Sequence, residues 1–242
     1  MNASDQIFGS NKNEPFDPLR YDGHVDAPQE VARMLAELVP KGSRVLDVGC
    51  GTGSVSRIIA DTRGAKITGI EPNSSRAAVA RSRGLEVHEE PFTPSILQRL
   101  EPFNVVMFAD VLEHVVDPSD LLKLSDRALL PGGRVIASVP NVAHWSVRVD
   151  LLRGRFDYQP FGIRDATHLR WFTEKTIRLL FESSGLRIIS LQHTAGVTLP
   201  EYEARRPWRW IPRQRRNSLI RTLARRLPLL FGCQHIIHAV PA

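Results

Sequence analysis

The sequence predicts one α/β domain with a doubly wound, parallel sheet. Apolar runs of buried-strand length alternate with segments of helical periodicity, an alternation typical of parallel sheets. Three glycines follow the first apolar run directly, in VLDVGCGTG (45–53). The length of 242 residues, 42% of them hydrophobic and 24% charged, suits a globular domain with a sizeable core.

The elements are expected in a regular order along the chain. Apolar residues at helical spacing predict a helix over 27–39, where Pro28 suits the first turn and Pro40 follows the end. Later, Thr173 and Gly185 bound a further helix. The other expected helices cover 54–62, 74–82 and 118–129, and the expected strands cover 44–48, 65–72, 85–90, 103–110, 133–140, 186–194 and 233–240.

Three segments lie outside this alternation. Residues 1–26 are polar and rich in Asn and Pro, which predicts a mobile N-terminal arm before a domain over 27–242. Residues 141–172 form an insertion after the fifth core strand, and 199–232 form an Arg-rich helical insertion before the last strand. A long insertion over the carboxyl edge of a sheet is typical of an active-site cover.

Composition excludes several classes of protein. No run of eighteen apolar residues could span a membrane, and the polar residues 1–23 predict no secretory signal. Cys50 and Cys233 lie far apart without metal-type spacing, so we expect a reducing cytoplasm, no disulfide and no metal site. Nine arginines against two glutamates give 201–232 a charge of +7, while the whole chain carries +6, so no nucleic-acid partner is expected.

The glycine cluster predicts a ligand site. Ligands bind at the carboxyl ends of parallel strands, where Gly49, Gly51 and Gly53 would let the backbone approach a ligand closely. Asp47 could orient this loop or accept a bond from a cationic ligand group. Glu71 ends the next strand, eighteen residues after Gly53, where a carboxylate can accept both ribose hydroxyls. Together these features predict a nucleoside cofactor.

The spacing of the glycines distinguishes between nucleoside cofactors. A dinucleotide fingerprint, G-x-G-x-x-G, would need its third glycine at position 54, which is Ser54, and the loop carries no P-loop lysine. An NAD-dependent or nucleotide-sugar oxidoreductase is therefore the less favoured alternative.

Three stretches together resemble a known superfamily. DVGCGTG with the strand-terminal Glu71, then FADVLEHVVDP (108–118) and LLPGGRVIASVPN (129–141), are similar to the ordered motifs of class I S-adenosylmethionine-dependent methyltransferases. The resemblance covers about 44–141. It implies a Rossmann-like, seven-stranded, mostly parallel sheet with helices on both faces, and S-adenosyl-L-methionine as the cofactor.

The resemblance also implies roles for individual residues. The glycine loop would hold the methionine part of the cofactor, Glu71 the ribose, and Glu89 or Glu90 with Pro91 and Phe92 would lie near the adenine. The implied cofactor-binding set is Tyr21, Asp47, Gly49, Gly51, Gly53, Glu71, Pro72, Glu90, Phe92, Asp110, Val111 and Leu112. Simpler alternatives are that Phe92 is core, that Glu113 begins a helix and that His114 is structural.

Candidate catalytic residues lie in the insertion. Methyl transfer to a hydroxyl requires an aligned acceptor and a base, and His144 and His168 are the histidines of this segment. Asp165 precedes His168 by three residues and could orient its ring. The alternative for His168 is a bond to a backbone carbonyl that fixes the loop. Side chains that could hold an anionic or sugar-like acceptor are Tyr158, Arg164, Arg170 and Trp171.

The insertion also suggests an acceptor class. PNVAHWS, LLRGRFDY and DATHLRWFT resemble a bacterial branch often found beside or fused to glycosyltransferases of polysaccharide and lipid-sugar pathways. The branch also resembles quinone-type O-methyltransferases. We therefore expect O-methylation of a sugar, glycolipid or other small-molecule hydroxyl. A non-catalytic S-adenosylmethionine-binding module is the alternative.

The Arg-rich insertion has two interpretations. Leu219, Ile220, Leu223 and Leu227 would share one helical face of 215–231, with arginines around it and two tryptophans before it. Such a stretch fits peripheral contact with the inner face of a membrane through 207–231. The alternative, slightly favoured, is that its apolar side packs on its own domain.

Overall fold

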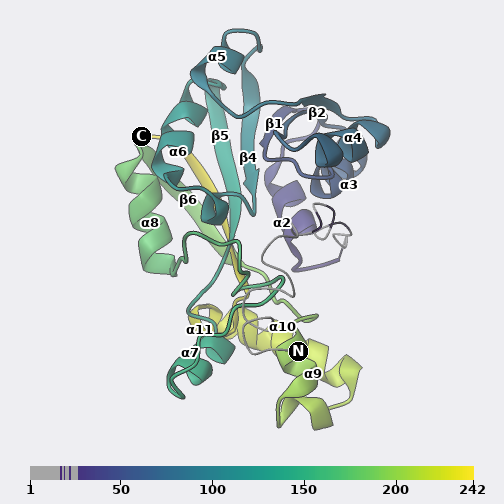
Figure 1. Cartoon of the computed structure of the whole chain (residues 1–242), viewed down its shortest axis with the longest axis vertical. Helices are drawn as coiled ribbons and strands as arrows, with labels where there is room; N and C mark the ends of the chain where they lie inside the picture. The colour runs from purple at the N-terminus through teal and green to yellow at the C-terminus, as the bar shows by residue number, and fades with distance from the viewer. Residues whose placement is uncertain (1–16, 18, 20–21, 23–26) are drawn as a thin grey trace.

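The computed structural model describes residues 17, 19, 22 and 27–242 (Figure 1). Most of the expected N-terminal arm, including Tyr21, lies outside these described residues. The proposed role of Tyr21 over the cofactor therefore stays a prediction.

Seven strands form one sheet in the order β3-β2-β1-β4-β5-β7-β6. All neighbours pair in parallel except β7, which is antiparallel to both β5 and β6. The predicted seven-stranded, mostly parallel, doubly wound sheet is thus confirmed. The strands are β1 (Arg44–Val48), β2 (Lys66–Ile70), β3 (Glu86–His88), β4 (Phe103–Ala109), β5 (Leu129–Pro140), β6 (Leu186–His193) and β7 (Gln234–Pro241).

Helices cover both faces of the sheet. One apolar cluster joins α2, α3 and α4 to the sheet, and a second joins α5, α6 and α8 to the opposite face (Figure 1). Because both faces are buried, the central strands are almost continuously apolar, as expected for a parallel sheet. The helices are α2 (Val31–Leu38), α3 (Ser54–Arg63), α4 (Ser74–Ser82), α5 (Pro94–Leu97), α6 (Pro118–Asp126) and α8 (Glu174–Ser183).

Strand register aligns the carboxyl ends of the central strands. Val45 of β1 lies beside Ile67 of β2 on one side and Val105 of β4 on the other. The loops that follow these three strands therefore open at the same edge of the sheet, beside the change of strand order between β1 and β4.

Strand β5 begins earlier than the sequence predicts, whereas helix α8 begins where it was expected. Strand β5 begins at Leu129 rather than at 133, because the Pro131-Gly132-Gly133 turn is absorbed into the strand where its register against β4 shifts. Helix α8 begins after Thr173, whose hydroxyl accepts the backbone N–H of Thr176, while the Thr176 hydroxyl accepts the backbone N–H of Thr173.

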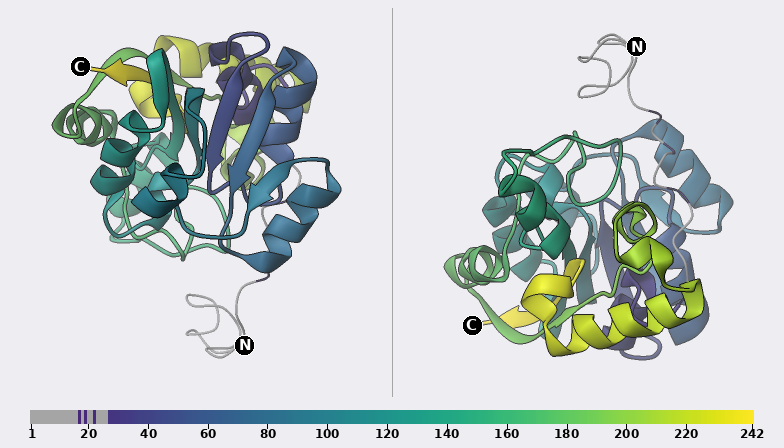
Figure 2. Two further views of the ribbon diagram at one scale, coloured as in Figure 1. Left: turned by 90° about the horizontal axis from the view of Figure 1, so that it is seen from above. Right: turned by 90° about the horizontal axis from the view of Figure 1, so that it is seen from below.

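The Arg-rich insertion packs on its own domain. In helix α10 (Arg213–Arg226) the buried residues are Arg216, Ile220 and Ala224, while Leu219 and the C-cap residue Leu227 are 41% and 50% exposed. Of the residues predicted to share one apolar face, Ile220 is thus buried against the domain, whereas Leu219 and Leu227 are exposed. The elements of this insertion are α9 (Pro200–Ala204), the 3-10 helix η2 (Trp208–Trp210), α10 and α11 (Pro228–Phe231). The helices gather beyond one end of the sheet in Figure 1 and lie toward the viewer in the right-hand view of Figure 2.

A buried guanidinium explains which face of α10 is inward. Arg216 donates to the backbone carbonyl of Tyr202 at 3.0 Å and contacts the carboxylate of Glu203. Ile220 and Ala224, one and two turns later, then join an apolar cluster with Tyr202. Among the helices described, none has the length and apolar character needed to cross a bilayer.

Candidate functional site

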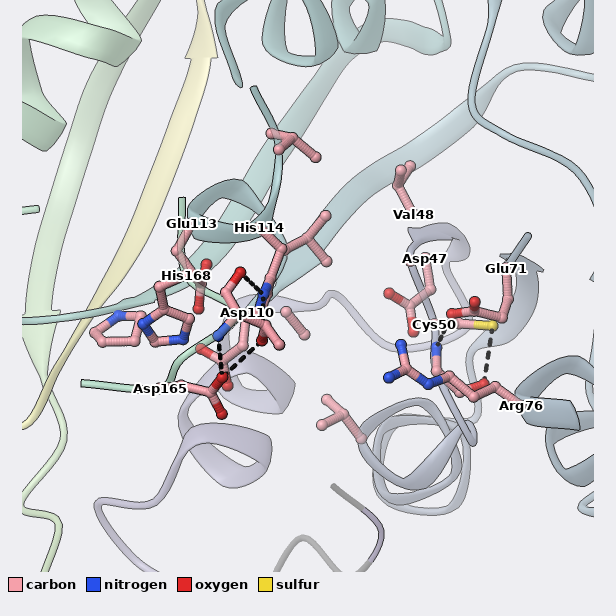
Figure 3. Close-up of a pocket in the computed structure, with 18 of the residues that line it drawn as sticks. Asp47, Val48, Cys50, Glu71, Arg76, Asp110, Glu113, His114, Asp165 and His168 are labelled. Carbon is pink, nitrogen blue, oxygen red and sulfur yellow. Dashed lines mark hydrogen bonds between the residues drawn. The ribbon is translucent and has the colours of Figure 1, made fainter. Parts of the chain in front are cut away.

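A cavity of about 740 Å³ opens at the carboxyl edge of β1, β2 and β4. This volume lies within the range of small-molecule and cofactor pockets. Figure 3 shows Asp47, Cys50 and Glu71 on one side, and Glu113, His114 and His168 on the other. The cavity therefore joins the two regions that the sequence assigned to cofactor and to acceptor.

The glycine loop adopts backbone conformations that favour glycine. The φ angles of Gly49, Gly51 and Gly53 are +73°, +56° and +75°. A Cβ at Gly49 would approach a methyl of Val111 to 2.8 Å, so this glycine lets the loop after β4 pack closely. A Cβ at Gly51 would meet no described atom within 4 Å, and Gly51 lines the cavity. Gly51 thus borders open space.

Gly53 has a different role from its neighbours. It precedes α3, and a Cβ there would approach Leu85 to 2.4 Å and Ala80 to 3.2 Å. It is not among the described residues that line the cavity. The third glycine therefore permits close packing of α3 and α4, and its expected contact with the cofactor stays a prediction.

Glu71 ties the glycine loop to the loop after β2. One carboxylate oxygen accepts the backbone N–H of Gly51 at 3.0 Å, and the other accepts that of Asn73 at 2.8 Å. Glu71 is buried yet lines the cavity with its neighbour Pro72. A carboxylate oxygen has two lone pairs, so each oxygen retains the capacity to accept a ligand hydroxyl.

Asp47 combines burial with an unused acceptor. Its Oδ2 accepts the hydroxyl of Ser56 at 2.5 Å, whereas Oδ1 is buried without a hydrogen-bond partner in the described structure. Burial, together with the nearby charge of Glu71, raises the pKa of Asp47 to about 7. An unpartnered buried acceptor in a cavity wall is suited to a donor group of a ligand.

Only two of the residues expected near the adenine line the cavity. Pro91 and Phe92 line the cavity, and Phe92 packs edge-on against Phe108. Glu90 is instead paired with Arg99 at 2.5 Å. Neither Glu90 nor its neighbour Glu89 is among the described lining residues, so neither meets the expectation of an adenine contact.

Asp110 ends β4 in a strained conformation. Its φ of +54° is uncommon for a residue other than glycine. Its Oδ1 accepts the hydroxyl of Ser138 at 2.8 Å and the amide of Gln234 at 2.8 Å. These bonds hold the chain so that Asp110 and Val111 line the cavity. Leu112, expected beside them, is instead fully buried in the hydrophobic core.

Backbone bonds bring the insertion to the loop after β4. The carbonyl of Glu113, in the 3-10 helix η1 (Leu112–His114), accepts the N–H groups of Leu169 and Arg170 at 2.8 and 3.0 Å. The ring of His168 consequently lies 4.8 Å from the ring of His114 in an edge-on contact. Glu113, His114 and His168 all line the cavity and are called the Glu-His-His cluster below.

Burial dominates the electrostatics of this cluster. Glu113 is 1% exposed, and its burial, with the nearby charge of Asp110, raises the pKa of its carboxyl well above the usual range. Burial and the neighbouring His114 lower the pKa of His168 to about 4. His168 is therefore neutral at pH 7 and carries a lone pair.

Asp165 lies in the cavity wall but makes other bonds than those expected. Its Oδ1 accepts both the backbone N–H and the hydroxyl of Thr167, at 2.7 and 2.6 Å. Asp165 therefore shapes the turn that carries His168. The charge of Asp165 and the backbone of Ile163 both favour the protonated His168 ring, but burial outweighs them and the pKa is lowered.

His144 is a core residue. It is 0% exposed, and its ring contacts the hydroxyls of Ser146 and Tyr202 at 2.9 and 3.2 Å. Burial and the charge of Arg205 lower its pKa to about 3. It begins α7 (Trp145–Leu151) and is absent from the described cavity lining, which argues against the expected catalytic role.

The expected acceptor-holding side chains are engaged elsewhere. Arg164 is buried against Asp150 at 3.0 Å, and Arg170 donates to the carbonyl of Val116. Tyr158 and Trp171 pack with each other and with Phe156. None of these four belongs to the described cavity lining, so the expectation is wrong for a direct contact.

The chain matches the family model described as "Methyltransferase domain" over residues 20–191. It is also similar to two curated proteins named "Ubiquinone biosynthesis O-methyltransferase". Identity to the one from Pseudomonas putida (strain W619) is 40% over 106 residues, 41% of this chain and 45% of the relative. Identity to the one from Idiomarina loihiensis is 30% over 158 residues, 62% and 64% of the two chains.

One solved structure illustrates the likeness in fold. It is described as a SAM-dependent methyltransferase from Archaeoglobus fulgidus, and it superposes with a TM-score of 0.57 at 20% identity. The match covers 86% of this chain and 92% of that one. The sequence matches above thus span about half to two thirds of the curated relatives, whereas the likeness in fold extends over most of the chain.

Proposed function

The chain belongs to the methyltransferase-domain family, and on that premise we propose that it methylates a hydroxyl oxygen of a small molecule with S-adenosylmethionine. One observation carries the proposal. A single cavity has the glycine loop and Glu71 on one wall and the Glu-His-His cluster on the other. A cofactor site thereby adjoins groups able to bind and activate a hydroxyl.

The described residues fit this cofactor. Gly51 borders open space at φ +56°, Glu71 lines the cavity with acceptor capacity to spare, and Oδ1 of Asp47 is a buried acceptor without a described partner. A nucleoside with ribose hydroxyls and a cationic amino group offers the donors that these acceptors require. Asp110 and Val111 line the same cavity as the Glu-His-His cluster.

When bound, S-adenosylmethionine supplies an electrophilic methyl group for in-line transfer. The chain's own residues then have three tasks: to hold the acceptor, to exclude water and to favour the ionised acceptor oxygen. The buried Glu-His-His cluster is the part of the wall suited to the third task. Nδ1 of His168 has no described partner, so its lone pair is available for the acceptor hydroxyl or for a group that binds it.

Replacement of His168 by glutamine tests this role. If His168 assists ionisation of the acceptor, turnover should fall by about 10²-fold or more while affinity for S-adenosylhomocysteine stays within about threefold. His88→Gln, at a histidine outside the described cavity lining, is the matched control. Unchanged turnover in His168→Gln would remove the histidine from the mechanism.

For the acceptor we propose only the reacting group, which is a hydroxyl. The relatives' names refer to ubiquinone biosynthesis, and the insertion motifs resemble a branch associated with sugar pathways. Both classes offer a hydroxyl. We would incubate the enzyme and methyl-labelled cofactor with polyphenolic quinone precursors in one arm and with sugar lipids in the other. Label transfer to nitrogen only would contradict O-methylation.

Two rival functions predict different binding. A nucleotide-dependent oxidoreductase should bind NAD, and a non-catalytic module should bind S-adenosylhomocysteine without any turnover. Calorimetry with both ligands, repeated on Glu71→Gln, separates them. We expect S-adenosylhomocysteine alone to bind, at least about tenfold more weakly to the variant, because Gln replaces one buried acceptor with a donor facing an N–H.

We also propose that the surface over 207–231 contacts an anionic membrane. Trp210, Leu219, Leu227 and Leu229 are exposed apolar residues in a segment rich in arginine, a composition suited to a bilayer surface. Flotation with anionic liposomes at low salt should carry the protein upward, and Trp210→Ser should reduce the bound fraction. Equal recovery with neutral and anionic liposomes would refute the proposed attraction between the arginines and anionic lipids.

A further inference from the structure

The Glu-His-His cluster brings together three residues that can each ligate a metal ion, whereas a general base for methyl transfer needs only one of them. Glu113, His114 and His168 each offer one metal-ligand atom, and these three atoms lie within 4.8 Å of one another. Figure 3 shows the three side chains side by side at one end of the cavity. Two come from the loop after β4 and one from the insertion, joined by the backbone bonds to Glu113.

The Glu-His-His cluster contains buried polar atoms that have no hydrogen-bond partner in the described structure. Both carboxylate oxygens of Glu113 and Nδ1 of His168 have no hydrogen-bond partner within the described part of the chain, although these residues are 1% and 7% exposed. A buried polar atom without a partner costs about 1–3 kcal/mol, and more when it is charged. Such a cost is retained only if another group satisfies these atoms.

The two histidines offer ring nitrogens to the cluster in different ways. Nδ1 of His168 is buried without a hydrogen-bond partner in the described structure, so its lone pair is available to an ion when the proton is on Nε2. Nδ1 of His114 lies 3.3 Å from the carbonyl of Thr167, so a proton on Nδ1 places the His114 lone pair on Nε2. Metal-binding histidines typically fix their tautomer through such carbonyl bonds.

We propose that Glu113, His114 and His168 together bind one divalent transition-metal ion in the cavity. Two imidazoles and one carboxylate are a known ligand set for ions such as Zn²⁺, Fe²⁺ and Co²⁺, and the set leaves coordination positions open. Bonds of about 2.0–2.2 Å need ligand atoms at most about 4 Å apart, so the cluster must contract by less than about 1 Å.

The inference differs from the sequence-based expectation of no metal site. That expectation rested on cysteine spacing, which does not report on a set of Glu and His. The ligands here come from positions 113–114 and 168, too far apart along the chain for a recognisable spacing. The ion would neutralise the buried carboxylate and satisfy the unpartnered imidazole nitrogen.

A role for the ion rests on the proposed function, whereas its binding does not. A hydroxyl of the acceptor would occupy an open coordination position and release its proton to solvent, because a divalent ion lowers the pKa of a bound hydroxyl. His168 would then act by holding the ion.

Cobalt is a direct probe of this site. We would titrate the purified, chelator-treated full chain with Co²⁺ in the absence of any methyl donor, and follow calorimetry and the visible ligand-field absorption. One equivalent should bind, with a spectrum that reflects nitrogen and oxygen ligands. The absence of stoichiometric Co²⁺ binding would overturn the proposal.

Three variants assign the ligands. Glu113→Gln is isosteric and removes the charge, His168→Gln removes a ligand, and His88→Gln is the matched control outside the cavity lining. The first two should bind Co²⁺ at least about 100-fold more weakly, since loss of a ligand exceeds the 10–100-fold loss seen for supporting residues. Native circular dichroism of each variant is checked first. Wild-type affinity in folded Glu113→Gln would also overturn the proposal.

Separate readouts distinguish this proposal from the proposed function. Binding of S-adenosylhomocysteine with no uptake of Co²⁺ would leave the methyltransferase proposal intact and reject the metal site. Uptake of Co²⁺ without affinity for S-adenosylhomocysteine would support the metal site and reject the methyltransferase proposal. If both bind, methyl transfer should fall at least tenfold after treatment with a chelator and recover on addition of Co²⁺ or Zn²⁺.

Discussion

Two glycines of the same loop should respond differently to the same substitution. Gly51 and Gly53 both have positive φ angles, so alanine at either position carries the left-handed penalty of about 1–2 kcal/mol. Only at Gly53 does the new Cβ also collide, at 2.4 Å from Leu85 and 3.2 Å from Ala80. Overpacking of this kind adds about 1–3 kcal/mol. We therefore expect a loss of about 1–2 kcal/mol for Gly51→Ala and about 2–5 kcal/mol for Gly53→Ala.

Thermal unfolding and ligand calorimetry together separate the two roles. For a domain of this size, 1 kcal/mol corresponds to a shift in Tm of about 2–4 °C. Gly51→Ala should lower Tm by a few degrees but weaken S-adenosylhomocysteine at least about tenfold, because the methyl group enters space that borders the cavity. Gly53→Ala should lower Tm further and bind within about threefold of wild type below its transition. The reasoning is refuted if Gly51→Ala binds normally or if both variants lose affinity equally.

Two further predictions follow from the burial of Asp47 and His144. The pKa of Asp47 is raised to about 7 by burial, so the folded state binds a proton more tightly than the unfolded chain, and this contribution to stability is lost as pH rises from about 4 to 7. The Tm of Asp47→Asn minus that of wild type should therefore increase over that interval, and a constant difference would contradict the raised pKa. Tyr202→Phe removes the hydroxyl that contacts both His144 and the indole N–H of Trp145, and should cost about 1–3 kcal/mol in chemical denaturation. Its affinity for S-adenosylhomocysteine should be unchanged; a specific loss of turnover with normal stability would instead return His144 to the active site.

The sequence predicted the fold because the determining signals are local. Apolar runs such as 44–48 and 103–110 must be buried on both faces, which requires helices between parallel strands. The sequence also predicted that Gly51, Asp47 and Glu71, the proposed cofactor-binding residues, lie together, because they follow or end neighbouring strands whose register brings them to one edge of the cavity. The packing role of Gly53 could not be predicted, because a glycine needed for a ligand and one needed for helix packing look alike in sequence.

Only the tertiary structure decided which side chains of the insertion face the cavity and which lie in the core. His144 and His168 are chemically equivalent in the sequence, yet a hydrogen bond to Tyr202, 58 residues away, fixes one in the core, while the carbonyl of Glu113 draws the other to the cavity. The sequence left both Glu113 and His114 open between a structural role, as a helix start and a structural histidine, and a functional one. Their partner lies more than fifty residues later, beyond the reach of periodicity or spacing. The sequence alone therefore determined the sheet and the glycine-loop wall of the cavity, because both arise from local pattern. Long-range packing determined which polar residues face that wall.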